Sequence, residues 1–108
     1  VNPGAPVHVS NGQTTASSLS HATPSVTTTL ANTMLVTAHG MTSSSTWTPP
    51  AGMTEAFDRA SKATPSGSGV SIVGSYAAQA GAGATGAKTA TANSNNDAGH
   101  GMILALSP

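Results

Sequence analysis

Residues 101–106 decide the fold of this chain, and they read Gly101-Met102-Ile103-Leu104-Ala105-Leu106. Successive side chains of a β-strand point to opposite faces, so an unbroken apolar run predicts a strand that is covered on both faces. The cover can come from a second sheet, from a segment outside this sequence or from another subunit. The run alone leaves these three sources open.

Shorter strand-like runs lie upstream, separated by glycine, proline and small polar residues. The first ends at Asn11-Gly12, a pair that predicts a hairpin turn. Short strands at close spacing with turn chemistry between them indicate an all-β fold, and we expect an antiparallel, jelly-roll-like β-sandwich with Gly/Pro/Ser/Thr-rich loops. The predicted strands upstream of the final one cover residues 6–10, 25–30, 33–39, 45–48, 54–58, 70–77 and 88–92.

One segment, residues 53–62, is also compatible with a helix. Glu55 and Arg59 are spaced i,i+4, as in a helical ion pair. Residues 54–58 alternate equally well as a strand that follows the turn at residues 49–52. We take the strand, because β-branched and small polar residues dominate the whole chain and helix signals are poor elsewhere.

Length and charge limit the kinds of partner. The 108 residues make one β-sandwich domain, residues 1–108, or the C-terminal part of a longer chain, since the sequence begins at Val1 without an initiator Met. Charged residues are 6% and the formal net charge is zero, so the excess of cations that binds nucleic acid is missing. No apolar run approaches the roughly 20 residues that span a bilayer, so we expect no membrane insertion.

The apolar residues are small, which predicts self-association. The hydrophobic fraction is 37%, but much of it is alanine, and the aromatic residues are only Trp47, Phe57 and Tyr76. A thin core leaves little free energy beyond the conformational entropy lost on folding. Zero net charge also removes the repulsion that keeps chains apart. A homo-oligomer in which a neighbour completes the core is therefore expected.

The carboxylates are too few and too badly spaced for acid–base catalysis. They are Glu55, Asp58 and Asp97, whereas glycoside hydrolysis needs two carboxyl groups facing each other. Glu55 and Asp58 are separated by an odd number of residues, so a regular strand would point them to opposite faces. Asp97 lies in an asparagine-rich loop, where its neighbour His100 suggests a dyad that no recognisable nucleophile accompanies.

Metal and thiol chemistry also lack a motif. The chain has no cysteine, and its four histidines do not have the close spacing of zinc motifs. We therefore expect no enzyme, no catalytic residue, no cofactor and no metal site. The histidines are His8, His21, His39 and His100.

Two aromatic residues are candidates for ligand binding. Trp47 and Tyr76 could each offer a flat ring on which a sugar stacks. Trp47 has a second interpretation as a core residue packed against Pro49 and Pro50, because the chain is short of large apolar side chains. Both interpretations follow from the residue type, and only burial can separate them.

Five segments together resemble a module of actinobacterial secreted proteins and of actinobacteriophage minor tail proteins. The most specific block reads Thr46-Trp47-Thr48-Pro49-Pro50-Ala51-Gly52-Met53-Thr54-Glu55. The other segments are residues 6–13, 23–36, 82–92 and 102–108, so that nearly the whole chain is covered.

The resemblance implies a β-sandwich at a virion or cell surface that has no catalytic motif to transfer. Members often carry a preceding β-rich half, which this sequence lacks. The implied function is a structural or attachment module of a phage tail, virion or extracellular surface, in contact with its own copies, other virion subunits or cell-surface glycan. A secreted carbohydrate-binding module and a subunit of a self-assembling extracellular fibre are the alternatives.

Overall fold

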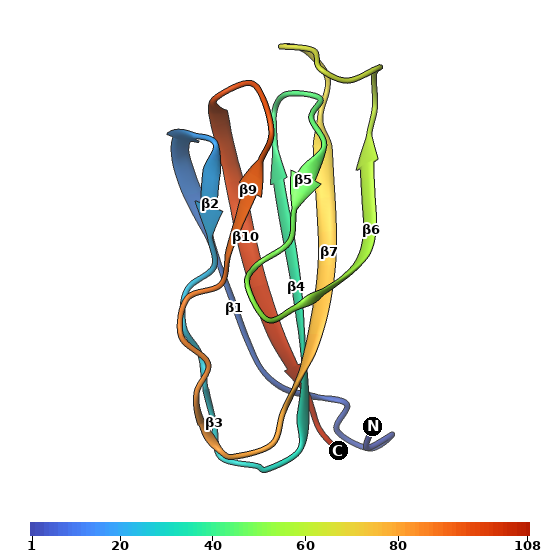
Figure 1. Ribbon diagram of the computed structural model, residues 1–108. Helices are drawn as coiled ribbons and strands as arrows, with labels where there is room; N and C mark the ends of the chain where they lie inside the picture. The colour runs from blue at the N-terminus through green and yellow to red at the C-terminus, as the bar shows by residue number, and fades with distance from the viewer.

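A computed structural model describes residues 1–108 as an all-β fold without a helix (Figure 1). None of its elements is therefore a helix that could cross a membrane. The strands are β1 (Val7–Ser18), β2 (Ser20–Ala22), β3 (Thr27–Thr28), β4 (Thr33–Met41), β5 (Trp47–Thr48), β6 (Thr54–Ala60), β7 (Ser71–Gln79), β8 (Gly83–Ala84), β9 (Thr89–Ala92) and β10 (Asp97–Leu106).

The strands form two layers. A five-stranded antiparallel sheet, here called the main sheet, has the order β1-β10-β4-β7-β6. The covering layer consists of the sheet β2-β9-β5, which lies over one side of the main sheet, and the pair β3-β8, which extends this layer beside one end of the main sheet (Figure 1). This arrangement confirms the predicted antiparallel β-sandwich. The two termini meet at one end, where the Asn2 amide donates to the Ser107 carbonyl at 3.2 Å.

The C-terminal apolar run takes the central place that its sequence predicts. β10 pairs with β1 on one side and with β4 on the other, both within the same chain. Ile103 and Ala105 are fully buried beneath the covering layer. A second sheet therefore covers one face of the run, and the opposite face carries Met102, Leu104 and Leu106.

The predicted hairpin turn at Asn11-Gly12 is wrong. β1 runs straight through it, with Asn11 opposite Ile103 and Gly12 opposite Met102. A two-residue turn of this kind needs positive φ at both central residues, and neither Asn11 nor Gly12 has one. The long β10 strand offers a continuous ladder, and this tertiary pairing outweighs the local turn preference of the dipeptide.

Residues 54–60 form strand β6, so the strand interpretation is confirmed and the helix is excluded. The predicted separation of Glu55 and Asp58 onto opposite faces is wrong. A β-bulge at Ala56 adds one residue, so Glu55 pairs with Ser75 and Asp58 pairs with Val73. Ser75 and Val73 both point into the sandwich, and the two carboxylates therefore share its inner side.

The core between the layers has few large apolar side chains and is unusually polar. Its main hydrophobic cluster contains Met41, Trp47, Val73, Ala90 and Ala92, with Leu19 packed against it. Most other buried side chains are serine, threonine or histidine. The hydroxyl groups in the strands follow from the sequence, because β-branched threonine suits a pleated strand and serine leaves room between two close layers.

Candidate interaction surface

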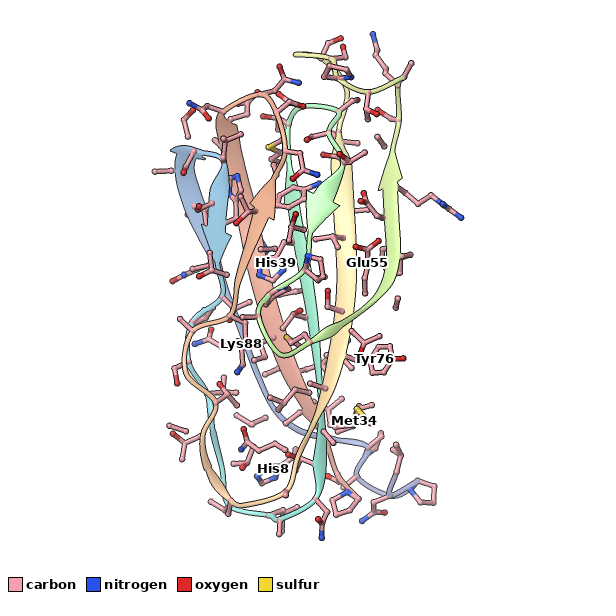
Figure 2. All side chains as sticks on the ribbon, viewed as in Figure 1. His8, Met34, His39, Glu55, Tyr76 and Lys88 are labelled. Atoms are coloured by element: carbon pink, nitrogen blue, oxygen red, sulfur yellow. The ribbon has the colours of Figure 1, made fainter.

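The side of the main sheet that faces away from the covering layer is apolar and open. We call it the outer face. Its most exposed large side chains are about two-fifths exposed, with Phe57 at 43%, Tyr76 at 42% and Met34 at 38%. Figure 2 shows Met34 and Tyr76 close together beside β7. The other apolar residues of the outer face are Val36, Ala38, Ile72, Met102, Leu104 and Leu106.

Strand alternation produces this face directly. In β4 (Thr33–Met41) all odd-numbered residues are buried, and all even-numbered residues are partly or fully exposed. In an antiparallel sheet with one side in water, the residues that point to that side are normally polar. Here it contains Met34, Val36 and Ala38. The strand is apolar in both phases, so half of its apolar side chains lack cover within the chain.

Small residues hollow the middle of the outer face. A row across the sheet runs from Gly12 through Met102, Ala38 and Gly74 to Phe57, each residue opposite the next. The Phe57 ring lies on Gly74, where a Cβ would overlap the ring. One apolar hollow results, and its lining includes Met34, Val36, Ala38, Phe57, Gly74 and Tyr76.

A second hollow continues the outer face toward the opposite end of the strands. It lies over Gly40 and Ile72, with Val70, Arg59 and His100 among its lining residues. Glycine at position 40 removes a side chain from the middle of this row, since His100, Gly40 and Ile72 are successive cross-strand partners. The outer face is thus a shallow apolar surface with projecting side chains and two depressions.

Only one formal charge lies on the outer face. Arg59 is opposite Ile72 and shares its side of the sheet. Glu55 and Asp58 lie on the inner side because of the bulge, and Lys62 follows β6 in a loop. A surface with so little charge excludes electrostatic recognition of a highly charged ligand and favours an apolar partner.

The two aromatic residues predicted to bind a ligand lie in different parts of the molecule. Tyr76 is on the outer face, beside the first hollow. Trp47 is only 4% exposed in the hydrophobic core, so its ring faces are not accessible to a sugar. The structure places Trp47 in the core, as its second interpretation predicts. Ligand binding at Tyr76 stays a prediction.

Trp47 joins the two layers through hydrogen bonds as well as packing. Its indole Nε1 donates to Ser71 Oγ at 3.0 Å, and the Ser71 hydroxyl donates to the Ser43 carbonyl at 2.6 Å. The Trp47 amide donates to Asp58 Oδ2 at 2.8 Å. Asp58 is thus engaged with the backbone of β5, which is a structural role for this carboxylate.

Two of the four histidines are buried between the layers. His39 Nε2 bonds to the Lys88 carbonyl oxygen at 3.0 Å, and His21 Nδ1 pairs with the Thr15 hydroxyl. The His21 ring lies 5.5 Å from the Trp47 ring, centroid to centroid. Figure 2 shows His39 within the sandwich. His21 Nε2 and His39 Nδ1 have no hydrogen-bond partner.

Burial controls the protonation of these two histidines. Desolvation lowers the pKa of both His21 and His39 below the usual 6.5, although the backbone groups of Ser18 and Lys88 act in the opposite direction. The nearby carboxylate of Asp97 also raises the pKa of His21, but burial outweighs it. Both rings are therefore neutral core residues at neutral pH.

The structure does not form the dyad of Asp97 and His100 suggested by the sequence. The His100 ring lies near Gly12 on the outer face, whereas Asp97 accepts a hydrogen bond from Ser43 Oγ at 2.6 Å at the end of the sandwich. This bond, the nearby Thr42 side chain and the hydrogen bond from the Ala98 amide lower the pKa of Asp97. Asp97 thus links the start of β10 to the loop after β4.

The carboxylates lie away from the two hollows of the outer face. Neither hollow of the outer face is lined by an aspartate or a glutamate. No group of three or more His, Cys, Asp or Glu residues is arranged to hold a metal ion. The three carboxylates are divided between β6 and the start of β10, with Asp58 and Asp97 each bonded to structural partners.

Most residues of the outer face were not identified from the sequence as site residues. Tyr76 was, but Met34, Phe57, Ile72 and Met102 were not. The available signal was the continuous apolar character of residues 102–106 and of residues 34–36. Such runs show that both strand faces are apolar, but they do not say which face the chain itself covers.

Comparison of the chain with known protein families, with characterised proteins and with solved structures found no match. The resemblance to actinobacterial and actinobacteriophage surface proteins therefore stays a prediction.

Proposed function

We propose that this protein is a non-enzymatic structural or attachment module of a phage tail, virion or extracellular surface, and that it acts through self-assembly. The observation that carries the proposal is the outer face of the main sheet. Nine apolar side chains of four neighbouring strands lie on it with one formal charge at its margin. Monomeric soluble proteins rarely leave a continuous apolar surface of this extent open.

A second copy of the chain fits this surface in size and chemistry. Five strands spaced about 4.8 Å apart, and nine residues at about 3.4 Å each along β4, give an area of about 700 Å². A stable interface buries about 800 Å² on each partner. Projecting rings such as Phe57 and Tyr76 stand beside depressions at Ala38 and Gly40, so a two-fold related copy can place its side chains in these depressions.

The alternative is a secreted carbohydrate-binding module. The exposed ring of Tyr76 beside an apolar hollow supports it, because sugar rings stack on tyrosine. In that case the outer face binds glycan and the protein remains a monomer. In the favoured proposal, glycan contact is an additional property of an assembled surface.

Light scattering of the eluted protein tests the proposal. We expect the wild-type chain to elute as a dimer or larger species at micromolar concentration. Tyr76→Lys places a second positive charge on the outer face and is expected to raise the dissociation constant at least about tenfold, since a buried unpaired charge costs more than about 1.4 kcal/mol.

Thr91→Lys is the matched control. Thr91 is exposed on β9 in the covering layer, between the inward-facing Ala90 and Ala92. Thr91→Lys therefore introduces the same charge on the opposite side of the molecule. It should leave the mass unchanged. A monomeric wild-type protein that binds glycans on an array, with binding lost in Tyr76→Lys, would instead establish the carbohydrate-binding alternative.

A further inference from the structure

We infer that β1 is a second assembly surface, whose free edge pairs antiparallel with the β1 edge of another copy of this chain. β1 is the outermost strand of the main sheet and pairs with β10 alone (Figure 1). It is 12 residues long, which makes it the longest strand of the protein. None of the backbone hydrogen bonds formed outside the strand ladders involves a residue of β1.

The ladder defines which backbone groups are free. The Thr42 amide donates to the Ala98 carbonyl at 3.2 Å, so the backbone of Ala98 points toward the chain of β4. Because successive residues of a strand alternate, Gly101 and Ile103 then point toward β1. Their partners in β1 are Gln13 and Asn11. The residues between and beside these partners must direct their amides and carbonyls away from the sheet.

Three residues therefore present free backbone groups: Ser10, Gly12 and Thr14. One side-chain bond agrees with this assignment. The Gly12 amide donates to Asn11 Oδ1 at 2.8 Å, a contact available only to an amide that β10 does not use. The Ser10 and Thr14 amides and the carbonyls of all three residues have no partner outside the ladder. This pattern is the template on which another strand can form hydrogen bonds.

The opposite edge of the same sheet is protected, and the contrast is informative. β6 carries Glu55, Asp58 and Arg59 within seven residues and is interrupted by the bulge at Ala56. Charges and bulges are the usual means by which proteins prevent edge-to-edge pairing. β1 has no charged residue at all, and its two register irregularities, at Val7–Val9 and Thr15–Ser18, leave the segment 9–15 regular. In a pairing of β1 with itself, this absence removes the like-charge contacts that would oppose a two-fold interface.

The geometry also specifies the register. β1 departs from regular pairing between Val7 and Val9 and again between Thr15 and Ser18, which leaves residues 9–15 as the regular segment. Its centre is Gly12. A two-fold axis there places Gly12 opposite Gly12 of the second copy and Ser10 opposite Thr14 of the second copy. These residue pairs direct their backbone groups at each other and can exchange two hydrogen bonds each.

This inference goes beyond the proposed function, because the edge and the outer face are different surfaces. A protomer with two separate two-fold interfaces forms a closed tetramer if the two axes meet at right angles, and an open chain otherwise. Edge pairing would also place two outer faces on the same side of one continuous sheet, separated by the Ser10, Gly12 and Thr14 positions of the two β1 strands.

Proline substitution tests the edge. Thr14→Pro removes an outward amide and leaves the bonds to β10 intact, whereas Thr14→Ala removes only the side chain. Each substitution is combined with Tyr76→Lys in a double variant, so that association through the outer face is blocked. Tyr76 lies on β7, three strands from β1. We expect Tyr76→Lys and Tyr76→Lys/Thr14→Ala to retain a dimer, and Tyr76→Lys/Thr14→Pro to raise its dissociation constant at least about tenfold.

The pair Ser10→Pro and Ser10→Ala repeats the test at the symmetric position, in case Thr14→Pro impairs folding, which circular dichroism would reveal. Equal dimerisation of a folded proline variant and its alanine control overturns the edge inference. So does a monomeric Tyr76→Lys protein. Neither result affects the proposed function, which depends on the mass difference between the wild-type protein and Tyr76→Lys.

Cysteine cross-linking tests the register without depending on affinity. The chain has no cysteine, so any disulfide is the engineered one. The two-fold axis places Asn11 opposite Gln13 of the second copy, at about the 4.5 Å Cα separation that a disulfide spans. Asn11→Cys mixed with Gln13→Cys should form a covalent heterodimer under mild oxidation. Either variant alone should not, since the diagonal separation is about 7–8 Å. Equal cross-linking in all three samples overturns the register.

Discussion

Single residues without side chains determine how closely the two layers approach. Gly101 is buried in β10, and a Cβ built on it would lie 2.5 Å from the Ala22 carbonyl oxygen and 3.0 Å from the Thr23 amide nitrogen. Both atoms belong to the backbone of the segment that crosses β10. A side chain at position 101 would therefore displace the main chain of the covering layer, which a rotamer change cannot relieve.

Gly101→Ala is expected to lower the free energy of unfolding by about 2 kcal/mol or more, as overpacking against backbone does. Urea unfolding followed by Trp47 fluorescence measures this change. Gly81→Ala is the matched control, because a Cβ at Gly81 meets no atom within 4 Å and its φ is not positive. The control should be neutral or slightly stabilising. Equal stability of the two variants would contradict the close approach of the layers at Gly101.

At the scale of elements, one hydroxyl connects three of them. Ser71 at the start of β7 accepts from the Trp47 indole in β5 and donates to the Ser43 carbonyl in the loop after β4. Ser71→Ala leaves the indole N–H and the carbonyl without their partner inside the sandwich. We expect the free energy of unfolding to fall by about 1–3 kcal/mol. Ser17→Ala, on the exposed part of β1, should change it by less than about 0.5 kcal/mol. Equal values would mean that water replaces the hydroxyl.

The sequence predicts where most strands lie, but it does not predict where β1 ends or which way the side chains of β6 point. Residues 33–39 and 54–58 lie within β4 and β6, and the predicted strand 70–77 begins one residue before β7, because apolar and β-branched residues favour extended structure whatever their partners. The path of β1 through Asn11-Gly12 depends on β10, which is about 90 residues away in sequence. The bulge at Ala56 likewise depends on the pairing with β7. Neither feature has a local signal.

The candidate site, too, was predictable from the sequence only in part. Tyr76 could be identified as a potential contact residue from its type alone, and Trp47 could not be assigned to the core or the surface without its neighbours. The outer face is a property of the whole sheet. It arises only when β4, β7 and β10 are placed side by side in register, so that apolar residues of different strands meet in rows.

At the scale of the whole molecule, two neutral imidazoles between the layers make the stability of the sandwich depend on pH. The pKa values of His21 and His39 are lowered by burial, so the unfolded chain binds protons more readily than the folded one. Stability is therefore fully present above the unfolded pKa of about 6.5 and is lost as the pH falls toward the folded values. Below about 3.8 the protonation of Asp97 adds a further loss, since its pKa is lowered in the fold.

The free energy of unfolding should accordingly decrease between pH 7.5 and pH 5, by at most about 1.4 kcal/mol per pH unit for each histidine. Urea titrations at several pH values measure this slope. His39→Gln keeps a donor for the Lys88 carbonyl but cannot titrate, so its slope should be smaller than that of the wild-type protein. Thr91→Gln changes an exposed residue of the covering layer that does not titrate and should keep the wild-type slope. A wild-type slope of zero over this range would show that the two buried rings accept protons as readily in the folded chain as in the unfolded one. In that case water must reach the space between the layers, and the two sheets would not form the closed core on which the sandwich depends.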